Sequence, residues 1–388
     1  MENPVTYPIL NLCARIRPHS LQRCRLASAC IDFSQWDALL YQAEEHGMGP
    51  LLQRHFAGID VEVPGTFIRG LRFLSLRHQQ ANALLMKSLH QILSLLEAEG
   101  IPVLVLKGAA LCQTLYPEIG LRPMRDIDLL LAKEDVQHVH VFLQNNGFQA
   151  STAALPEGYF HLPPLFKTVD GMHVCVELHH GLFPDDPPYY EPLPFAELYQ
   201  NRLVFEVCGM KACTLATEEM LWHLFQHGFH APLTYEPYRL ISVSDIVSLV
   251  EDKVKDIDWE KITTIYPQLL RALPLFHYIT PWNNIVLTRI SFKTEAAPSG
   301  VGESFKGWPR VKLIQQRDIG ALEMLRHTFF PAQWWLMLYY STGEGLISSV
   351  WCRLIRHPMH IFRWVKFYGS IFLKGKVQPV DDDTGKKG

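Results

Sequence analysis

The sequence predicts an α/β fold of the α+β kind, in which a small mixed-sheet core is flanked by N-terminal and C-terminal helical regions. Residues 101 to about 205 alternate short apolar strands with helical segments and then add a hairpin, a pattern typical of a compact α/β unit. The segments before residue 101 and after Thr217 instead repeat apolar residues at intervals of three and four. A chain of 388 residues also exceeds what one ordinary hydrophobic core holds, so several packed regions are expected.

These changes in pattern divide the chain into four regions. Residues 1–100 form a helical N-terminal region, and residues 101–210 form the α/β core. Residues 211–330 form a helical domain with a flexible Gly-, Ser- and Pro-rich loop near 293–310. Residues 331–388 form an aromatic and basic helical segment that ends in a disordered tail.

The N-terminal region is predicted to end in one long helix with a glycine stop. After Pro64 the apolar residues fall on a single helical stripe, and Gly100 suits the left-handed conformation that often follows a helix. The residues of this stripe are Leu85, Leu89, Ile92, Leu93 and Leu96.

The core is predicted from three strand signals. The run Ile101–Leu106 is short, apolar and rich in β-branched residues, as in a buried strand. A helix follows Lys107-Gly108, and the stretch RPMRDIDLLL then supplies the next strand. Farther along, two alternating runs flank Asp170-Gly171, a dipeptide that strongly favours a two-residue hairpin turn.

Carboxylates on two of these strands indicate a metal site. Asp126 and Asp128 are two residues apart, so they share one face of their strand with Cα atoms about 6.5 to 7 Å apart. The later strand GMHVCVELHH carries one acid, Glu177, on the face opposite its valines. Oxygen ligands of this kind favour hard cations, so Mg²⁺ or Mn²⁺ is expected.

The turn at Lys107-Gly108 is suited to a phosphate. The N-terminus of the following helix offers free N–H groups, Gly108 permits close approach, and Lys107 adds a positive charge. Arg122 either contacts a triphosphate or balances the two aspartates, while charge balance is favoured for Arg125.

Histidines offer a zinc alternative, which the spacing disfavours. Four polar side chains alternate along the strand of Glu177, but they spread over about 20 Å and cannot all reach one ion. These four are His173, Cys175, Glu177 and His179. A better fit has His179 or His180 beside the catalytic metals. His223 and His227 lie four apart without the glutamate of an HExxH motif, so core or interface histidines are expected.

Together these motifs resemble the DNA polymerase β-like nucleotidyltransferase superfamily. Its signature combines a glycine-containing turn after a strand, a strand with two alternating acids, and a third acid on a later strand. More narrowly, residues 35 to about 250 resemble the bacterial "nucleotidyltransferase family protein" group. The matching motifs are W…A…HG (Trp36, Ala43, His46 and Gly47), LKG (Leu106–Gly108), Tyr116 with Arg122, and DIDLL.

The resemblance implies an NTP-dependent, pyrophosphate-releasing transfer of NMP by a two-metal mechanism. ATP is the expected donor, and the acceptor is a hydroxyl or phosphate of a small molecule, sugar, peptide or protein. The residues implied to be catalytic and metal-binding are Asp126, Asp128 and Glu177, and those implied to bind the nucleotide are Lys107, Gly108, Ala109 and Arg122.

Ala109 departs from the family pattern, because a serine usually stands at its position; Lys107 is expected to compensate. The substitution keeps open an alternative in which the protein binds a nucleotide or a partner without turnover. Two further alternatives are a tRNA-modifying nucleotidyltransferase and a helical scaffold with an inserted α/β unit. The intact trio of acids favours the enzyme, since a cluster of like charges is costly to keep without a function.

Composition restricts partners and compartment. The net charge of −3 disfavours a long nucleic acid, although a local groove would suffice for a tRNA end. Eight cysteines without a CxxC pair, no signal-peptide pattern and no apolar run of about twenty residues predict a cytoplasmic protein. Basic residues interleave with aromatics after Trp351, which fits peripheral contact with a membrane surface, an acidic acceptor, or a packed helical end with solvated arginines.

Overall fold

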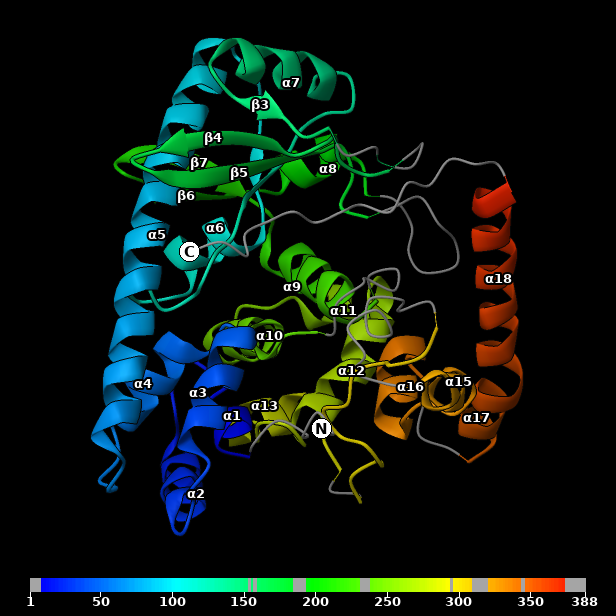
Figure 1. Ribbon diagram of the computed structural model, residues 1–388. Coiled ribbons are helices and arrows are strands. Elements are labelled where there is room, and N and C mark those ends of the chain that lie inside the picture. The colour runs from blue at the N-terminus through cyan, green and yellow to red at the C-terminus, as the bar shows by residue number, and fades with distance from the viewer. Residues whose placement is uncertain are drawn as a thin grey trace.

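The structure is a computed structural model of the 388-residue chain. It describes residues 8–152, 155, 159–183, 193–230, 238–293, 296–308, 320–342 and 346–373. A mixed sheet lies at one end of the molecule and helices pack below it, so the predicted fold class is confirmed (Figure 1). The predicted disordered tail lies outside the described residues.

The N-terminal region is helical, as predicted. Its helices are α1 (Pro8–Leu12), α2 (Ser20–Cys30), α3 (Trp36–Glu45), α4 (Gly49–Phe56) and α5 (Gly65–Ala98). Helix α5 has 34 residues, about 51 Å, and contacts both α4 and strands of the sheet. All five residues of the predicted stripe are buried, and Gly100 follows with a φ of +68°. One long helix therefore joins the N-terminal helices to the sheet (Figure 1).

The sheet has seven strands in the order β3-β4-β5-β2-β1-β7-β6. Strand β2 lies inside it, parallel to β5 on one side and antiparallel to β1 on the other. The strands are β1 (Leu104–Val105), β2 (Ile127–Leu130), β3 (Gln149–Ala150), β4 (Leu165–Val169), β5 (Met172–His179), β6 (Leu203–Val207) and β7 (Met210–Thr214). The helices among them are α6 (Lys107–Thr114), α7 (Val136–Asn145) and α8 (Phe195–Gln200).

Two hairpins contribute to the sheet, of which the sequence analysis found one. The predicted β4–β5 turn forms at Asp170-Gly171 with φ values of +49° and +81°. Cys208-Gly209 adopts the same conformation, with φ values of +49° and +82°, between β6 and β7. The alternating runs LVFEV and MKACT carried that second signal, and they extend the sheet to Thr214.

Helices return after the sheet. They are α9 (Thr217–Phe225), the π-helical turn η1 (Gln226–His230), α10 (Leu240–Lys253), α11 (Trp259–Thr264), α12 (Pro267–Phe276), α13 (Asn284–Arg289), α15 (Ala321–Phe329), α16 (Gln333–Tyr340), α17 (Leu346–Trp351), the π-helical turn η2 (Cys352–Arg356) and α18 (His357–Leu373). In the described residues, no helix is both long enough and apolar enough to span a bilayer.

The segment predicted as a loop near 293–310 has neither helix nor strand at residues 296–308, which the structure describes. It is nevertheless anchored, because Phe305 is buried and stacks on Trp335 with ring centroids 4.5 Å apart. Burial of an aromatic side chain such as Phe305 is favourable enough to hold a loop against the core. One continuous apolar cluster then joins this segment, the sheet and the N-terminal helices.

Candidate active site

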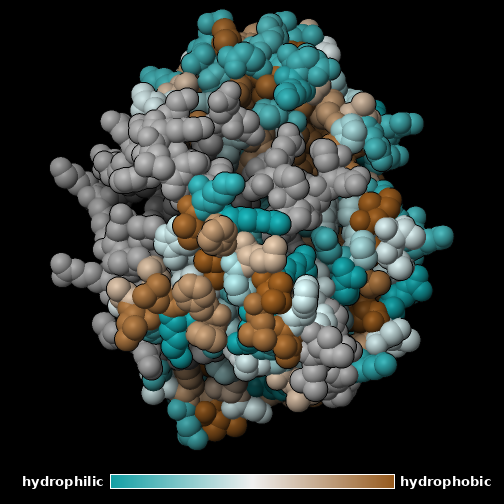
Figure 2. All heavy atoms as spheres, turned by 90° about the vertical axis from the view of Figure 1, so that its right-hand side faces the viewer, coloured by the Kyte–Doolittle hydropathy of each residue, from teal (hydrophilic) through white to brown (hydrophobic). Residues whose placement is uncertain are grey.

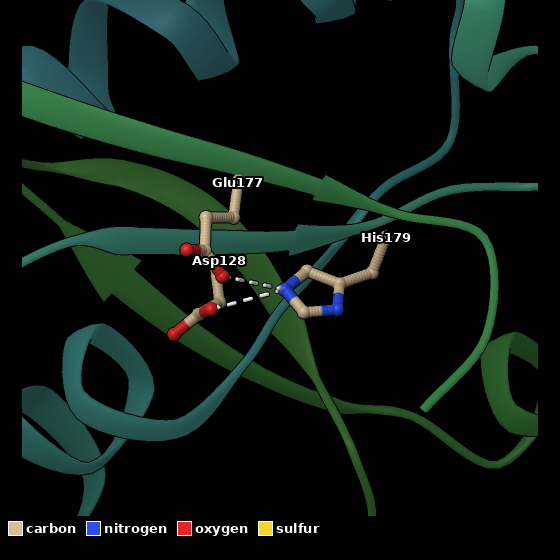
Figure 3. Close-up of side chains that lie close together, drawn as sticks. All are labelled: Asp128, Glu177 and His179. Carbon is tan, nitrogen blue, oxygen red and sulfur yellow. Dashed lines mark hydrogen bonds and ion pairs between the residues drawn. The ribbon is translucent and has the colours of Figure 1, made fainter. Parts of the chain in front are cut away.

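The strand pairing brings the acids of β2 and β5 together. Asp128 lies directly opposite Glu177 in the parallel register, and His179 follows two residues later on the same face of β5. Their side chains lie close together, with the His179 ring directed toward both carboxylates (Figure 3). The alternation along each strand turns Ile127 and Leu178 into the core instead.

His179 links the two carboxylates. Its Nε2 lies 3.0 Å from Asp128 Oδ1 and 3.6 Å from Glu177 Oε2. One potential ligand atom from each of the three residues lies within 4.8 Å of the others. His179, expected from the sequence only as one of two histidines near the metals, lies between the two carboxylates.

Lys107 supplies a positive charge to the same carboxylate. Its Nζ donates to Asp128 Oδ1 at 2.9 Å, from a side chain that is only 13% exposed. The residue opens α6 with a φ of +43°, the left-handed region that a non-glycine residue rarely adopts. Such backbone strain is found preferentially where a side chain is held for a function.

The charges of this cluster depend on one another. Burial by itself would raise the pKa of Asp128, but the Lys107 ammonium and the His179 hydrogen bond hold it well below its usual range. Burial is also the largest single influence on Glu177 and would raise its pKa, but the contact with His179 and the charges of Lys107 and His179 together lower it. In return, the two carboxylates raise the pKa of His179 against the effect of its own burial.

Asp126 lies at the edge of the cluster and behaves differently. Burial, followed by the charge of Asp128, raises the pKa of Asp126 to about 7, and Glu177 acts in the same direction. Asp126 is outside the group of three whose ligand atoms lie within 4.8 Å of one another. Its carboxyl therefore feels the repulsion of the cluster without sharing the hydrogen bonds of His179.

A divalent cation suits this donor set. Two carboxylates and an imidazole face one point, and burial together with the charges of Asp128 and Glu177 raises the pKa of the third carboxyl, Asp126. A cation bound between them would relieve that repulsion. Carboxylate oxygens favour Mg²⁺ or Mn²⁺, while the imidazole is a donor common in transition-metal sites.

Arg122 belongs to a buried network with helix α10. Its Nε lies 2.9 and 3.0 Å from the two oxygens of Asp245, and its Nη2 donates to Oδ2 at 2.7 Å. The Tyr116 hydroxyl donates to the other oxygen, Oδ1, at 2.7 Å. The Asp245 carboxylate on α10 is therefore held by Arg122 and Tyr116 together.

Gly108 lies under the remaining nitrogen of that guanidinium. A Cβ at Gly108 would come within 2.3 Å of Arg122 Nη1 and 3.2 Å of Met124 Cγ. The guanidinium cannot easily move away, because Asp245 holds it from the other side. Ala109, the next residue, is 2% exposed and packs in the core, so its side chain is not available to a ligand.

Two further histidines, His223 on α9 and His227 on η1, belong to the helices that follow the sheet. His223 is fully buried, and neither of its ring nitrogens has a hydrogen-bond partner among the residues that the structure describes. Its ring lies 6.2 Å from that of His227, which is exposed and whose pKa the Lys107 charge lowers to about 3. His223 is thus buried, as expected for a core histidine, but within the described part of the chain its ring lacks the hydrogen bonds that a core histidine usually makes.

Comparisons with known proteins complete these observations. The sequence profile described as "uncharacterised nucleotidyltransferase" matches residues 32–280, which include every residue discussed above. No curated protein matches the chain in sequence.

Solved structures match at low identity. ANT(2″)-Ia in complex with adenylyl-2″-tobramycin is 16% identical, with a TM-score of 0.31 over 47% of this chain and 95% of that chain. A nucleotidyltransferase-like protein from Paracoccidioides brasiliensis is 14% identical, with a TM-score of 0.32 over 56% and 94%.

Proposed function

Because this chain belongs to the uncharacterised nucleotidyltransferase family, whose profile covers residues 32–280, we propose that it transfers NMP from an NTP, with ATP as the donor. The acceptor is a hydroxyl or phosphate of a small molecule, a sugar, a peptide or a protein. The observation that carries the proposal is the convergence of Asp128, Glu177 and His179 beside the Lys107 ammonium.

Asp126, Asp128 and Glu177 are the proposed metal ligands, with His179 either as a fourth donor or as the residue that orients two of them. When bound there, Mg²⁺ or Mn²⁺ supplies positive charge to the triphosphate and to the attacking oxygen. The reaction joins the acceptor oxygen to the α-phosphorus and breaks the bond to the β-phosphate, so pyrophosphate leaves.

Glu177 is the proposed acceptor of the proton from the attacking hydroxyl. Its side chain is 22% exposed, whereas those of Asp128 and His179 are 3% and 1% exposed. It is therefore the member of the three-residue cluster that an incoming substrate reaches most easily. The His179 ring, with Nε2 3.6 Å from Oε2, draws this carboxylate toward Asp128.

Lys107, Gly108, Ala109 and Arg122 are the proposed nucleotide site. The first N–H groups of α6 have no partner inside the helix, so Gly108 and Ala109 offer them to phosphate oxygens. Lys107 adds a positive charge at this turn, which compensates for the serine hydroxyl that is missing at Ala109. Arg122 presents Nη1 above the same turn while Asp245 holds the rest of its guanidinium.

A second candidate is a nucleotide-binding protein of the same fold without turnover. The observations that favour it are the core position of Ala109 and the ion pair between Lys107 and Asp128, which occupies a carboxylate needed for the metal. A tRNA acceptor and a cytoplasmic location also remain proposals. All eight cysteines are free thiols, which is compatible with a reducing compartment.

The test is incubation with each α-³²P-NTP, Mg²⁺ or Mn²⁺, and cell extract, with RNA digested in a parallel sample. Label should appear on an acceptor, be lost in Asp128→Asn, and persist in the matched variant Asp170→Asn, whose carboxylate lies in an exposed turn. Nucleotide binding without transfer selects the second candidate. Absence of both binding and transfer overturns the proposal.

A further inference from the structure

Helices α16 and α18 are joined by buried hydrogen bonds between polar side chains. Tyr340 of α16 lies with its hydroxyl 2.8 Å from His357 Nδ1 and 3.0 Å from His360 Nδ1 of α18. His357 Nε2 lies 2.7 Å from the carbonyl oxygen of Thr328. These contacts bury both histidines and fix the rotation of α18 about its axis.

The outer side of the same helical stretch is apolar. From α17 through η2 into α18, large side chains recur at intervals of three to five on the exposed side. These are Trp351, Leu354, Met359 and Phe362, each more than half exposed. An ordinary amphipathic helix of a globular protein has the reverse arrangement, with its apolar stripe against the core.

Helix α15 continues this surface. It contacts α18, and Leu322 and Phe330 at its two ends are 83% and 66% exposed. Figure 2 faces this side of the molecule and shows brown side chains gathered there with teal ones among them. Exposed apolar side chains that gather on one side of a protein often mark an interaction site. We call the exposed apolar residues of α15, α17, η2 and α18 the C-terminal apolar face.

The positive charge of residues 346–373 restricts which partner can bind the C-terminal apolar face. Residues 346–373 contain Arg353, Arg356, Arg363 and Lys366 and no acidic residue, although the whole chain has a net charge of −3. Two copies meeting through this segment would oppose their like charges. A partner rich in negative charge that also accepts apolar side chains fits both properties.

We propose that the C-terminal apolar face docks on an anionic lipid bilayer. The helix would lie in the plane of the interface, with Trp351 and Phe362 in the boundary between headgroups and acyl chains. Arg363 and Lys366 would contact the lipid phosphates. The inward hydrogen bonds of His357 and His360 would keep the apolar side turned toward the lipid. The proposal stands independently of the catalytic site.

Sedimentation of the full chain with vesicles tests it. Binding is expected to vesicles of phosphatidylglycerol and phosphatidylcholine in equal parts, to fall with rising salt, and to be at least about tenfold weaker to phosphatidylcholine alone. The double variant Arg363→Glu/Lys366→Glu and the variant Phe362→Ser should each weaken binding about tenfold or more.

Matched controls lie on α5, whose outer side is also exposed. Arg69→Glu/Arg72→Glu has the same spacing and charge change, and Phe73→Ser removes a ring that is 65% exposed, against 73% for Phe362. Both controls should bind vesicles like the native chain. The proposal is overturned if anionic vesicles are not preferred or if the α5 variants lose binding equally. It is also overturned if the chain is a dimer in solution that Phe362→Ser dissociates.

Discussion

Asp128 and Glu177 lie directly opposite each other on the parallel strands β2 and β5. Like charges at such paired positions destabilise a sheet. The pair persists because His179 reaches both carboxylates and Lys107 donates to Asp128. Two cations thus hold together an arrangement that would otherwise repel, and the variants below separate the stabilising role of each group from its catalytic role.

Asp128→Ala should destabilise the fold, whereas Glu177→Gln should not. Loss of the Asp128 carboxylate leaves the buried Lys107 and His179 without their main partner, which costs about 3 to 5 kcal/mol of unfolding free energy. Glu177→Gln removes a partly exposed charge and some repulsion, so a change within about 1 kcal/mol is expected. Urea denaturation measures both, and NMP transfer should be lost in both. Equal destabilisation would contradict this division of roles.

Lys107→Ala should have opposite effects on metal and nucleotide. Without the competing ammonium at Asp128, the affinity for Mn²⁺ alone should rise about tenfold, or about 1.4 kcal/mol. The affinity for the nucleotide should fall, because a phosphate contact is lost. Calorimetry with metal alone and with nucleotide checks both, and Lys87→Ala, an exposed lysine paired with Asp170, is the control. A fall in both affinities would mean that Lys107 only maintains the structure.

Asp126 should make stability depend on pH. Its pKa is raised from 3.8 to about 7, so the folded state holds a proton that the unfolded state releases between these values. The contribution of Asp126 to stability is therefore full below about pH 4 and declines up to about pH 7.

The measurement is the difference in unfolding free energy between the native chain and Asp126→Asn. The two should agree near pH 4, and the variant should be more stable at pH 8 by roughly 2 to 4 kcal/mol. Saturating Mn²⁺ should remove most of that difference, since a bound cation relieves the repulsion. A difference that does not change with pH would place Asp126 outside the cluster.

Gly108→Ala should act through Arg122. The added Cβ would meet Nη1 at 2.3 Å and displace a guanidinium that Asp245 holds, so a loss of about 1 to 3 kcal/mol is expected. Nucleotide affinity should fall while Mn²⁺ affinity at the carboxylates is retained. Gly65→Ala is the matched control, because its Cβ would meet Arg69 at an ordinary 3.5 Å. Wild-type nucleotide binding in Gly108→Ala would remove Arg122 from the proposed site.

The sequence by itself determined the local parts of this protein. Period-two alternation fixed which side chains of β2 and β5 leave the core, and period-three-and-four repetition fixed the buried stripe of α5. Asp170-Gly171 predicted the hairpin turn, because the positive φ values of such a turn restrict which residues can occupy it. Gly209, between two alternating runs, carries the same kind of signal for the hairpin at Cys208-Gly209. Three acids and the glycine turn were therefore visible as candidates before any fold was known.

Only the tertiary structure decided which candidates meet. Strand order and register depend on the packing of the whole chain, so no local pattern states that Asp128 faces Glu177 or that His179 joins them. The pairing of Arg122 with Asp245 likewise links residues far apart in the chain, and their charges alone allowed several partners. The sequence also could not show that α18 turns an apolar side outward. The rotation of that helix is set by buried hydrogen bonds to Tyr340 and not by the apolar pattern.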